Sequence, residues 1–346
     1  MTDLLRTTDR GLYCEAGDFY IDPWMPVDRA LITHAHGDHA RWGSHTYVCA
    51  SESARVLNTR LFNADISTRN WGEAFTINGV RISFHPAGHI LGSAQIRVEH
   101  RGETWVVSGD YKTEPDPTCT AFEPVKCNVF ITESTFGLPI YRWTPQSETF
   151  AEIAAWWRGN REAGRASVIF AYALGKAQRI LAGLADMAEG EFYTHGAVER
   201  LNRDYRDGGV ALPHTTYAAS VPKGHSWAGA LIVAPPSAAG STWLRRFGPA
   251  STAFASGWMR VRGARRRRSV DRGFVLSDHV DWPALMSAID ATGAERVLVT
   301  HGYRDPVVRV LREKGLSADS LASRWEGEGE LESEDEIVPD DETAPA

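Results

Sequence analysis

The sequence of 346 residues predicts an α/β fold organised as two units, on three observations. Short strand-like segments alternate with helical ones, with turn residues between them. The texture changes after Thr144-Pro145, where a second series of helices and strands begins. Beyond an arginine-rich stretch the pattern of the first part returns, as a strand, a histidine-bearing loop and a helix. A chain of this length can bury one large core or two moderate ones.

The first part is predicted to be mainly strands, because short runs rich in β-branched and aromatic residues are bounded by Gly, Pro, Asn and Asp. The predicted strands are 29–34, 81–85, 94–100, 104–110 and 128–133. No repeat of fixed period links them.

The second part is predicted to begin with a helix, for which Thr144 is the N-cap and Pro145 the first helical residue. This helix extends through residue 160. A strand, a helix and two further strands follow at 166–172, 175–187, 191–195 and 230–236, which favours a largely parallel sheet. Residues 273–293 and 295–315 then each predict a strand, a histidine-bearing loop and a helix.

Composition is ordinary for a folded globular protein, with 43% hydrophobic and 23% charged residues. No apolar run approaches the roughly 18 residues of a membrane span, and the first residues lack the pattern of a secretory signal. Cys14, Cys49, Cys119 and Cys127 form no CxxC pair and are expected to be reduced thiols. We therefore expect a cytoplasmic, nucleoid-associated protein with no membrane association.

The net charge of −7 comes from residues 326–346, which contain ten Asp or Glu and no Lys or Arg. Without them the chain has 37 basic and 34 acidic residues. This acidic segment has too few bulky apolar residues to offset the entropy of ordering, so a disordered tail is expected. A solvating role is the first interpretation. A nucleic-acid mimic that folds back on a basic groove and a partner-binding tail are the alternatives.

Residues 34–39 read HAHGDH and gather His34, His36, Asp38 and His39 directly after a predicted strand. Three other predicted strands are also followed by a possible ligand, namely His89, Asp110 and His301. Imidazole and carboxylate groups suit zinc, manganese or iron. An isolated histidine is usually a hydrogen-bonded structural residue, but the tight spacing of the HAHGDH cluster favours metal. So many ligands exceed one tetrahedral site and fit two neighbouring ions with a shared carboxylate.

The ordered motifs THAHGDH, AGHILGS, VSGDY, ITEST, LSDHVDW and VLVTHGY resemble those of the metallo-β-lactamase superfamily, in its β-CASP nuclease branch. The resemblance extends to about residue 320. It implies an αββα sandwich with a second α/β domain inserted. The implied boundaries are 1–140 and 273–325 for the metallo-β-lactamase domain and 141–272 for the β-CASP domain.

The resemblance also implies roles for the ligands of two divalent ions, zinc first, with manganese or iron as alternatives. One ion would be held by His34, His36 and His89. The other would be held by Asp38, His39 and His301, and Asp110 would bridge the two. Asp22, in FYIDPW, matches an acidic position that steadies the ligand loop. Such ions make hydroxide available at neutral pH and neutralise charge on phosphate oxygens.

Glu133 and His279 match an acidic residue and a histidine that pair beside the scissile phosphate, and with Asp38 they form the implied catalytic set. Held by Glu133, His279 would donate a hydrogen bond to the phosphate or a proton to the leaving oxygen. The residues alone leave two simpler readings open. Glu133 then reads as a helix-starting carboxylate, and His279 as an N-cap neighbour beside Asp278 and Asp281, and without the resemblance these readings are favoured.

The stretch from Arg260 to Arg272 carries seven arginines opposed only by Asp271, and arginine forks match phosphate geometry. Contacts of this kind position a strand without reading its sequence. Lys176 opens a predicted helix and is a further candidate for phosphate, although an ordinary helix start explains it equally well. Trp258 and Tyr172 are candidates for base stacking but better suited to the core. The predicted nucleic-acid contacts are Arg260, Arg262, Arg265, Arg266, Arg267, Arg268 and Lys176.

The choice between DNA and RNA rests on resemblance. Glu133 and His301 resemble RNA-processing members of the branch. The longer stretches FYIDPWMPVDRALITHAHGDHARWGS and DRGFVLSDHVDW resemble a bacterial subgroup described as ligase-associated DNA exonucleases. The resemblance therefore implies a DNA exonuclease of 5′-to-3′ polarity that acts in DNA repair, with an ATP-dependent ligase and a helicase as partners.

An RNA-processing ribonuclease is the alternative function, since it would use the same site. A small-molecule hydrolase would need neither the arginines nor the inserted domain. A binding subunit without activity would have lost ligands, whereas this sequence retains every one of them.

Overall fold

The computed structural model describes residues 3–261 and 270–325 and divides the chain into two compact units. The first unit runs to Arg142 and resumes at Asp278; the second is Trp143–Ser277. Both combine helices with sheets, which confirms the α/β class. The acidic segment 326–346 lies outside the described residues.

The first sheet of the first unit has the strand order β1-β2-β3-β4-β5-β6. The first three strands pair antiparallel, and the pairings from β3 to β6 are parallel. The 3₁₀ turn Ser51–Ser53 and helix α1 (Ala54–Arg60) connect β5 to β6. The strands are β1 (Arg6–Thr7), β2 (Leu12–Cys14), β3 (Phe19–Ile21), β4 (Arg29–Leu31), β5 (Thr46–Ala50) and β6 (Ile66–Arg69).

The second sheet of this unit has the order β19-β18-β11-β10-β9-β8-β7. Its strands are β7 (Phe75–Ile77), β8 (Val80–Pro86), β9 (Ala94–His100), β10 (Glu103–Val107), β11 (Val129–Ser134), β18 (Arg296–Gly302) and β19 (Ser317–Ser320). Alternating side chains of the two sheets, such as Leu31 and Val48 on one and Phe84 and Ile96 on the other, share one core.

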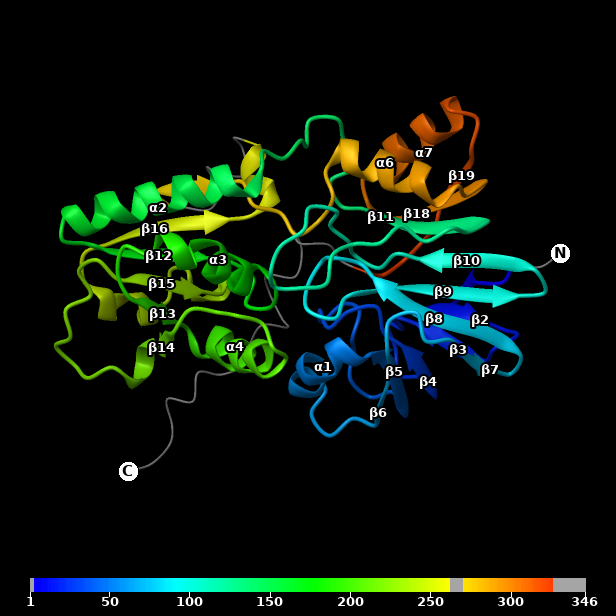
Figure 1. Ribbon diagram of the computed structural model, residues 1–346, viewed down its shortest axis with the longest axis horizontal. Helices are drawn as coiled ribbons and strands as arrows, with labels where there is room; N and C mark the ends of the chain where they lie inside the picture. Colours follow the sequence, from blue (N-terminus) through cyan, green and yellow to red (C-terminus); the bar gives the residue numbers. More distant parts are fainter. Residues whose placement is uncertain (1–2, 262–269, 326–346) are drawn as a thin grey trace. The chain divides into compact units, whose positions relative to one another are not determined.

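Helices α6 (Trp282–Thr292) and α7 (Arg304–Glu313) cover the other face of the second sheet (Figure 1). Leu285 and Ile289 of α6 and Leu311 of α7 pack there against Phe130 and Val299. Asp281 caps α6 by accepting a hydrogen bond from the Ala284 N–H at 2.9 Å, and Gly293 ends the helix in the left-handed conformation.

Strand direction in the second sheet brings several chain segments to one edge. β8 and β10 are each antiparallel to β9, so they run the same way, and β11 and β18 are parallel to β10. The carboxyl ends of β8, β10, β11 and β18 therefore share an edge. Side chains at or just beyond these ends are close in space although they are far apart in sequence.

A β-bulge shapes this edge between β11 and β18. Thr132 pairs with Val299 and Ser134 with Gly302, so one residue of β11 faces two of β18. The Ser134 hydroxyl lies 3.0 Å from the carbonyl oxygen of Thr300 and 2.5 Å from that of His301. Gly302 has φ +77°, and a Cβ there would lie 2.3 Å from the Ser134 carbonyl oxygen. Only glycine fits this position.

The second unit is built on a sheet of order β14-β13-β15-β12-β16-β17, in which every described pairing is parallel. Helices α2 (Gln146–Glu162), α3 (Lys176–Leu184) and α4 (Gly196–Asp207) lie along one face. Trp227, Trp243 and Phe247 pack on the core of the other face. The strands are β12 (Ala166–Phe170), β13 (Phe192–Thr194), β14 (Thr215–Tyr217), β15 (Leu231–Ala234), β16 (Ala250–Ala255) and β17 (Arg272–Phe274).

Two local expectations differ from the structure. The N-cap of α2 is Pro145 rather than Thr144, and Pro145 is extended with φ −50° and ψ 135°, so the helix starts one residue later. The second difference concerns the strand near Gly273. The boundaries implied by the resemblance place this strand in the metallo-β-lactamase domain, which would resume at residue 273. In the structure, β17 pairs with β16, because Gly273 aligns with Phe254, and the second unit continues to Ser277.

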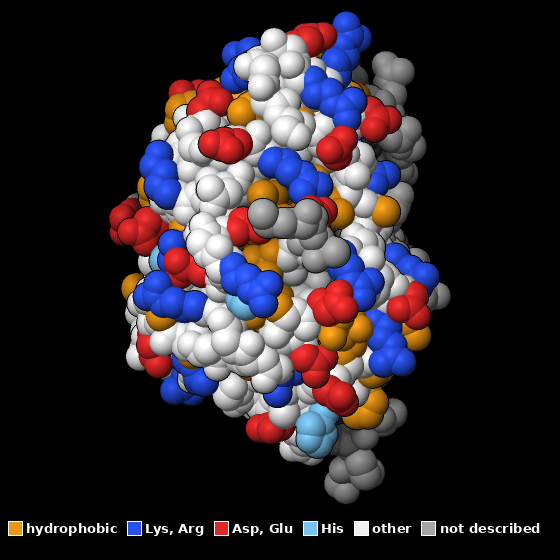
Figure 2. Space-filling view, turned by 90° about the vertical axis from the view of Figure 1, so that its right-hand side faces the viewer, with side chains coloured by type: hydrophobic (Ala, Val, Ile, Leu, Met, Phe, Trp, Pro, Cys, Tyr) orange, Lys and Arg blue, Asp and Glu red, His pale blue; other side chains and the backbone are white. Residues whose placement is uncertain are grey.

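The surface seen in Figure 2 carries basic and acidic side chains intermixed, without a large patch of one sign. Ion pairs on the first unit include Arg81–Glu99 at 2.9 Å and Arg309–Glu313 at 2.9 Å. Such exposed pairs contribute little to stability. In the part of the chain that the structure describes, no helix has both the length and the apolar composition needed to cross a membrane.

We predict that Gly302→Ala will destabilise the first unit by more than Gly315→Ala. Both glycines have positive φ, +77° and +89°, so both substitutions impose the backbone strain, which costs about 1–3 kcal/mol. Only at Gly302 would the new Cβ also meet a backbone oxygen, since the space around Gly315 is open. Urea unfolding of the two variants measures the difference. Equal destabilisation would show that the bulge adapts.

Candidate metal centre

The predicted ligands come together at the strand ends of the first unit. His34, His36, Asp38 and His39 follow β4, His89 follows β8, and Asp110 follows β10. His301 lies within the bulged end of β18. All except His36 are buried, and His36 is half-buried.

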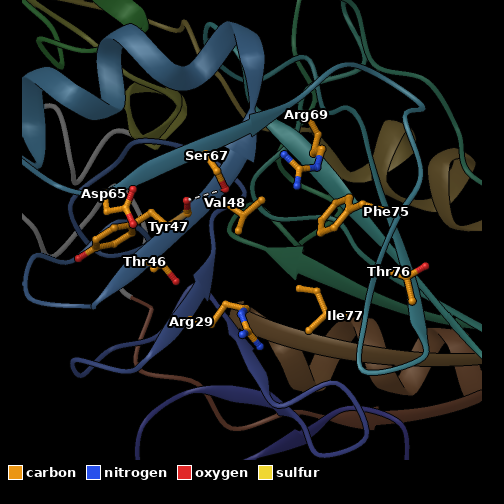
Figure 3. A pocket seen from close by; sticks show the side chains of 10 residues that line it. All are labelled: Arg29, Thr46, Tyr47, Val48, Asp65, Ser67, Arg69, Phe75, Thr76 and Ile77. Carbon is orange, nitrogen blue, oxygen red and sulfur yellow. Dashed lines mark hydrogen bonds between the residues drawn. The ribbon is translucent and has the colours of Figure 1, made fainter.

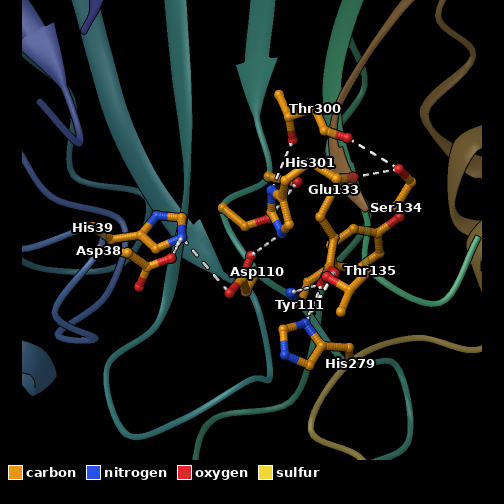
Figure 4. A network of polar contacts seen from close by, with 12 residues as sticks. Asp38, His39, Asp110, Tyr111, Glu133, Ser134, Thr135, His279, Thr300 and His301 are labelled. Carbon is orange, nitrogen blue, oxygen red and sulfur yellow. Dashed lines mark hydrogen bonds and ion pairs between the residues drawn. The ribbon is translucent and has the colours of Figure 1, made fainter. Parts of the chain in front are cut away.

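The carboxylate of Asp110 lies at the middle of this cluster (Figure 4). Its Oδ2 is 3.5 Å from His34 Nε2, 3.7 Å from His39 Nε2 and 3.9 Å from His89 Nε2. Its Oδ1 is 3.3 Å from His301 Nε2. Four imidazoles from three separate segments therefore direct the same ring atom, Nε2, at one carboxylate.

The close set consists of His34, His36, His89 and Asp110, whose ligand atoms all lie within 4.8 Å of one another. The other predicted ligands, Asp38, His39 and His301, form a second set that contacts Asp110 through His39 and His301. Within this second set, His39 Nε2 is 3.4 Å from Asp38 Oδ2. Both sets thus share Asp110.

Hydrogen bonds at Nδ1 fix the tautomers of His34 and His39. The single hydroxyl hydrogen of Thr33 is donated to Asp22 Oδ2 at 2.5 Å. The 3.0 Å contact between Thr33 Oγ1 and His34 Nδ1 then requires that Nδ1–H be the donor. His39 Nδ1–H donates to Asp22 Oδ2 at 2.7 Å. In its neutral form each of these histidines then has its lone pair on Nε2, the form in which imidazole binds metal.

The same logic applies to His89 and His301. His89 Nδ1–H donates to the carbonyl oxygen of Asp278 at 2.8 Å, since a carbonyl can only accept. The Thr300 hydroxyl donates to the Thr132 carbonyl at 3.1 Å, so His301 Nδ1–H donates to Thr300 Oγ1 at 3.3 Å. Four ring orientations are therefore set by groups outside the ligand set, as is usual for histidines that bind metal.

A cation fits this arrangement. His34 Nε2, His39 Nε2, His301 Nε2 and Asp110 Oδ1 are buried atoms with no hydrogen-bond partner among the described residues. Buried polar atoms are seldom left without a hydrogen bond, because each unsatisfied one costs about 1–3 kcal/mol. His89 Nε2 also lies only 3.1 Å from His36 Nδ1, a separation that a shared ion or proton must explain.

The electrostatics point the same way. Burial lowers the pKa of His34 and of His89 well below the usual value, so both stay neutral and can each offer a lone pair without first losing a proton. Burial would also lower the pKa of His39, but Asp38, Asp110 and Asp22 together raise it to about 10. The carboxylates on this side of the cluster thus require a positive charge nearby.

His279 and Glu133 lie beside the cluster and form a buried pair. His279 Nδ1 is 3.0 Å from Glu133 Oε1 and 2.9 Å from Oε2. Glu133 also accepts hydrogen bonds from the Tyr111 N–H at 2.9 Å and the Thr135 hydroxyl at 2.5 Å. The rings of His279 and His89 have centroids 4.8 Å apart. The carboxylate therefore holds His279 next to a predicted ligand.

Two supporting residues were not predicted from the sequence. Thr33 links Asp22 to His34, and it lies against Gly109, where a Cβ would come within 2.7 Å of the Thr33 side chain. Gly109 has φ +57° and so lets the Asp110 loop approach the first sheet. Trp325 packs on the ring of His39. A lone tryptophan before an acidic segment does not indicate in the sequence that it packs on a predicted metal ligand.

The predicted nucleic-acid contacts belong to the second unit or lie outside the described residues. Arg260 is exposed at the end of the turn Gly257–Arg260, whereas Arg262 and Arg265–Arg268 are outside the described part. The side chain of Lys176 is buried, with its Nζ 4.9 Å from the centroid of the Tyr172 ring. Trp258 is half-buried against the core. The role of these residues stays a prediction.

A cavity of about 300 Å³ in the first unit is separate from the metal centre (Figure 3). It is lined by residues at the starts of β4 and β5 and along β6 and β7, such as Arg29, Thr46, Ser67 and Phe75. His34 follows the opposite end of β4, and none of the predicted ligands lines the cavity.

Comparison with known proteins finds relatives among nucleic-acid enzymes. A probable DNA ligase of Opitutus terrae is 30% identical over 314 residues, which cover 89% of this chain. The endoribonuclease ysh1 of Emericella nidulans is 33% identical over 50% of the chain. The cleavage and polyadenylation specificity factor 73 of Drosophila melanogaster is 32% identical over 49%. No family model matches the chain.

These relatives are much longer proteins. The matched regions are 30%, 20% and 26% of their respective lengths, so this chain spans less than a third of each.

A crystal structure of a protein of unknown function from Enterococcus faecalis superposes with a TM-score of 0.57 at 10% identity, covering 86% of this chain and 80% of that one. This likeness concerns the fold alone.

We predict that the chain binds divalent metal and that Asp110→Asn lowers its metal content sharply. The substitution removes the one carboxylate charge that lies within 3.3–3.9 Å of four Nε2 atoms. Elemental analysis after dialysis against zinc measures the effect, and Asp290→Asn, an exposed carboxylate paired with Lys314, is the control. Unchanged zinc content in Asp110→Asn would argue against this cluster as the site.

Proposed function

Because the chain belongs to the β-CASP branch of the metallo-β-lactamase superfamily, we propose that it is a DNA exonuclease with a dinuclear metal centre. Its architecture supports this proposal. The sheet pair with α6 and α7 on one side fits an αββα sandwich, and the parallel unit Trp143–Ser277 fits an inserted β-CASP domain.

The proposed centre holds one ion on His34, His36 and His89 and a second on Asp38, His39 and His301, with Asp110 shared. Zinc suits this set of imidazoles and carboxylates best, and manganese or iron would also be accepted. When bound, such ions activate water at neutral pH and neutralise charge on phosphate oxygens. The protein supplies fixed Nε2 lone pairs through the Nδ1 hydrogen bonds at Asp22, Thr33, Asp278 and Thr300.

His279 is proposed to act on the substrate rather than on metal. With Nδ1–H held by Glu133, the charged form of His279 is stabilised, and its other nitrogen can donate a hydrogen bond to the phosphate or a proton to the leaving oxygen. The hydrogen bonds from Tyr111 N–H and Thr135 keep Glu133 in place. Glu133 is thus a positioning residue for His279.

The choice of DNA over RNA rests on one observation, the fraction of this chain that each relative matches. Similarity to the protein named a probable DNA ligase extends over 89% of this chain, whereas similarity to the endoribonucleases covers about half. This supports action on DNA. A role in repair, with a ligase and a helicase as functional partners, is part of the proposal. An RNA-processing ribonuclease is the second candidate, because the ysh1 proteins are named endoribonucleases and match the same chain. The 5′-to-3′ polarity is part of the proposal.

Arginine-rich residues 260–268 are proposed to hold the DNA backbone. Of the arginines in this stretch, only Arg260 lies in the described part, where it is exposed. Backbone contacts of this kind are independent of sequence and weaken as salt rises.

We predict that His279→Ala lowers kcat by about 10²–10⁴-fold, the usual contribution of a general acid or base, without loss of bound metal. Glu133→Gln should lower kcat less, because the amide still accepts a hydrogen bond but carries no charge. Steady-state hydrolysis combined with elemental analysis separates the two effects. His45→Ala, an exposed histidine of the same unit, is the control. Loss of zinc in His279→Ala would make His279 a ligand instead.

Substrate and polarity are tested with matched 5′-phosphorylated single strands of DNA and RNA, each labelled at either end, with zinc or manganese. Asp38→Ala/His39→Ala protein is the blank. We expect mononucleotide to appear early from the 5′ label of DNA and not of RNA. Preferential cleavage of RNA would contradict the proposed substrate, and early release from the 3′ label would contradict the polarity.

A further inference from the structure

Trp325 makes two contacts with the residues that support the metal centre. Its indole ring lies nearly parallel to the His39 ring, at an interplanar angle of 13° and a centroid distance of 5.5 Å. Its Nε1–H donates to the carbonyl oxygen of Asp22 at 2.9 Å. The side chain is 6% exposed and lies in the core shared by the two sheets. It therefore contacts both a predicted ligand and that ligand's hydrogen-bond partner.

Asp22 adopts a backbone conformation that needs support. Its φ is +43°, in the left-handed region that costs a non-glycine residue roughly 1–2 kcal/mol. Its N–H donates to the Leu31 carbonyl at 3.0 Å, and its carboxylate accepts bonds from Thr33 and His39. The Trp325 indole satisfies the remaining group, the carbonyl. Each polar group of Asp22 is thus used, and the indole holds the peptide that directs the carboxylate toward His39.

The segment before Trp325 is fastened to the second sheet. The Leu321 N–H donates to the Val299 carbonyl at 2.8 Å, and the Arg304 guanidinium donates to the Leu321 carbonyl at 3.3 Å. From this anchor the chain reaches Asp22, at the end of β3 in the first sheet. Trp325 therefore ties the sheet that bears His301 to the loop that bears His39.

We propose that Trp325 is a positioning residue for the ion on the His39 side of the centre. It acts through the Asp22 carbonyl and through the face of the His39 ring. The inference rests on the proposed dinuclear centre and goes beyond it. It states that the affinity for one ion depends more on the Trp325 side chain than the affinity for the other. His89 Nδ1 has its partner at Asp278, and His34 reaches Asp22 only indirectly, through Thr33, whereas His39 contacts both Asp22 and Trp325. Loss of the indole should therefore weaken the ion on the His39 side more than the other.

The test is a zinc titration of the full chain by calorimetry, with metal content checked after dialysis. Trp325→Phe keeps an aromatic face and removes the N–H, and Trp325→Ala removes both. We expect Trp325→Phe to weaken the binding of one zinc equivalent by about 10-fold and to affect the other less, within the range for outer partners of metal ligands. Trp105→Phe is the matched control, because Trp105 is buried in the same core without a hydrogen bond from its indole among the described residues.

A second variant separates positioning from general loss of structure. In a His39→Ala background, Trp325→Phe should cause no further loss of zinc affinity, because the His39 ring through which Trp325 acts is already absent. Equal weakening of both equivalents, or the same effect from Trp105→Phe, would overturn the role of Trp325. Wild-type zinc affinity in Trp325→Ala would also overturn it while leaving the proposed function intact. Wild-type protein that binds no zinc would overturn the proposed function, and this inference with it.

Discussion

Burial of negative charge is the constraint on which the rest of the site depends. Asp22, Asp38 and Asp110 are all buried, and an isolated buried carboxylate is strongly unfavourable. Burial alone would raise the pKa of Asp110, yet His39, His279 and His301 hold it well below its usual value. The negative charge of Asp110 is therefore offset either by protonated imidazoles or by cations that the neutral imidazoles bind. The bare Nε2 atoms directed at Asp110 favour cations.

Backbone geometry makes this concentration of charge possible. The parallel direction of β8, β10, β11 and β18 brings their ends to one edge, and the bulge opposite Glu133 turns His301 toward that edge. Two glycines permit the close approaches, Gly109 against Thr33 and Gly302 against Ser134. The polar partners of the histidines then fix which ring nitrogen faces inward. Ligand placement and ligand tautomer thus have separate structural causes.

The sequence predicted the parts of the site that leave a local signal. The HAHGDH cluster is dense enough to indicate metal by itself, and His89, Asp110 and His301 were found because each ends a readable strand. Asp22, Glu133 and His279 were identified only by resemblance, since a lone acidic residue or histidine has common structural explanations. Thr33 and Trp325 could not be predicted, because the role of Trp325 arises from contacts with residues distant in sequence and that of Thr33 from the acceptor that its hydroxyl bonds. Short strands such as β1 and β7 were also missed, because two or three residues carry no periodic pattern.

The most direct test of the dinuclear centre is an anomalous difference map, recorded at the zinc edge from crystals of the protein grown with zinc. The account predicts two peaks on either side of the Asp110 carboxylate, one beside His34, His36 and His89 and the other beside Asp38, His39 and His301. A single peak on the three-histidine side would contradict the shared role of Asp110. Peaks elsewhere, with none at this cluster, would contradict the account as a whole.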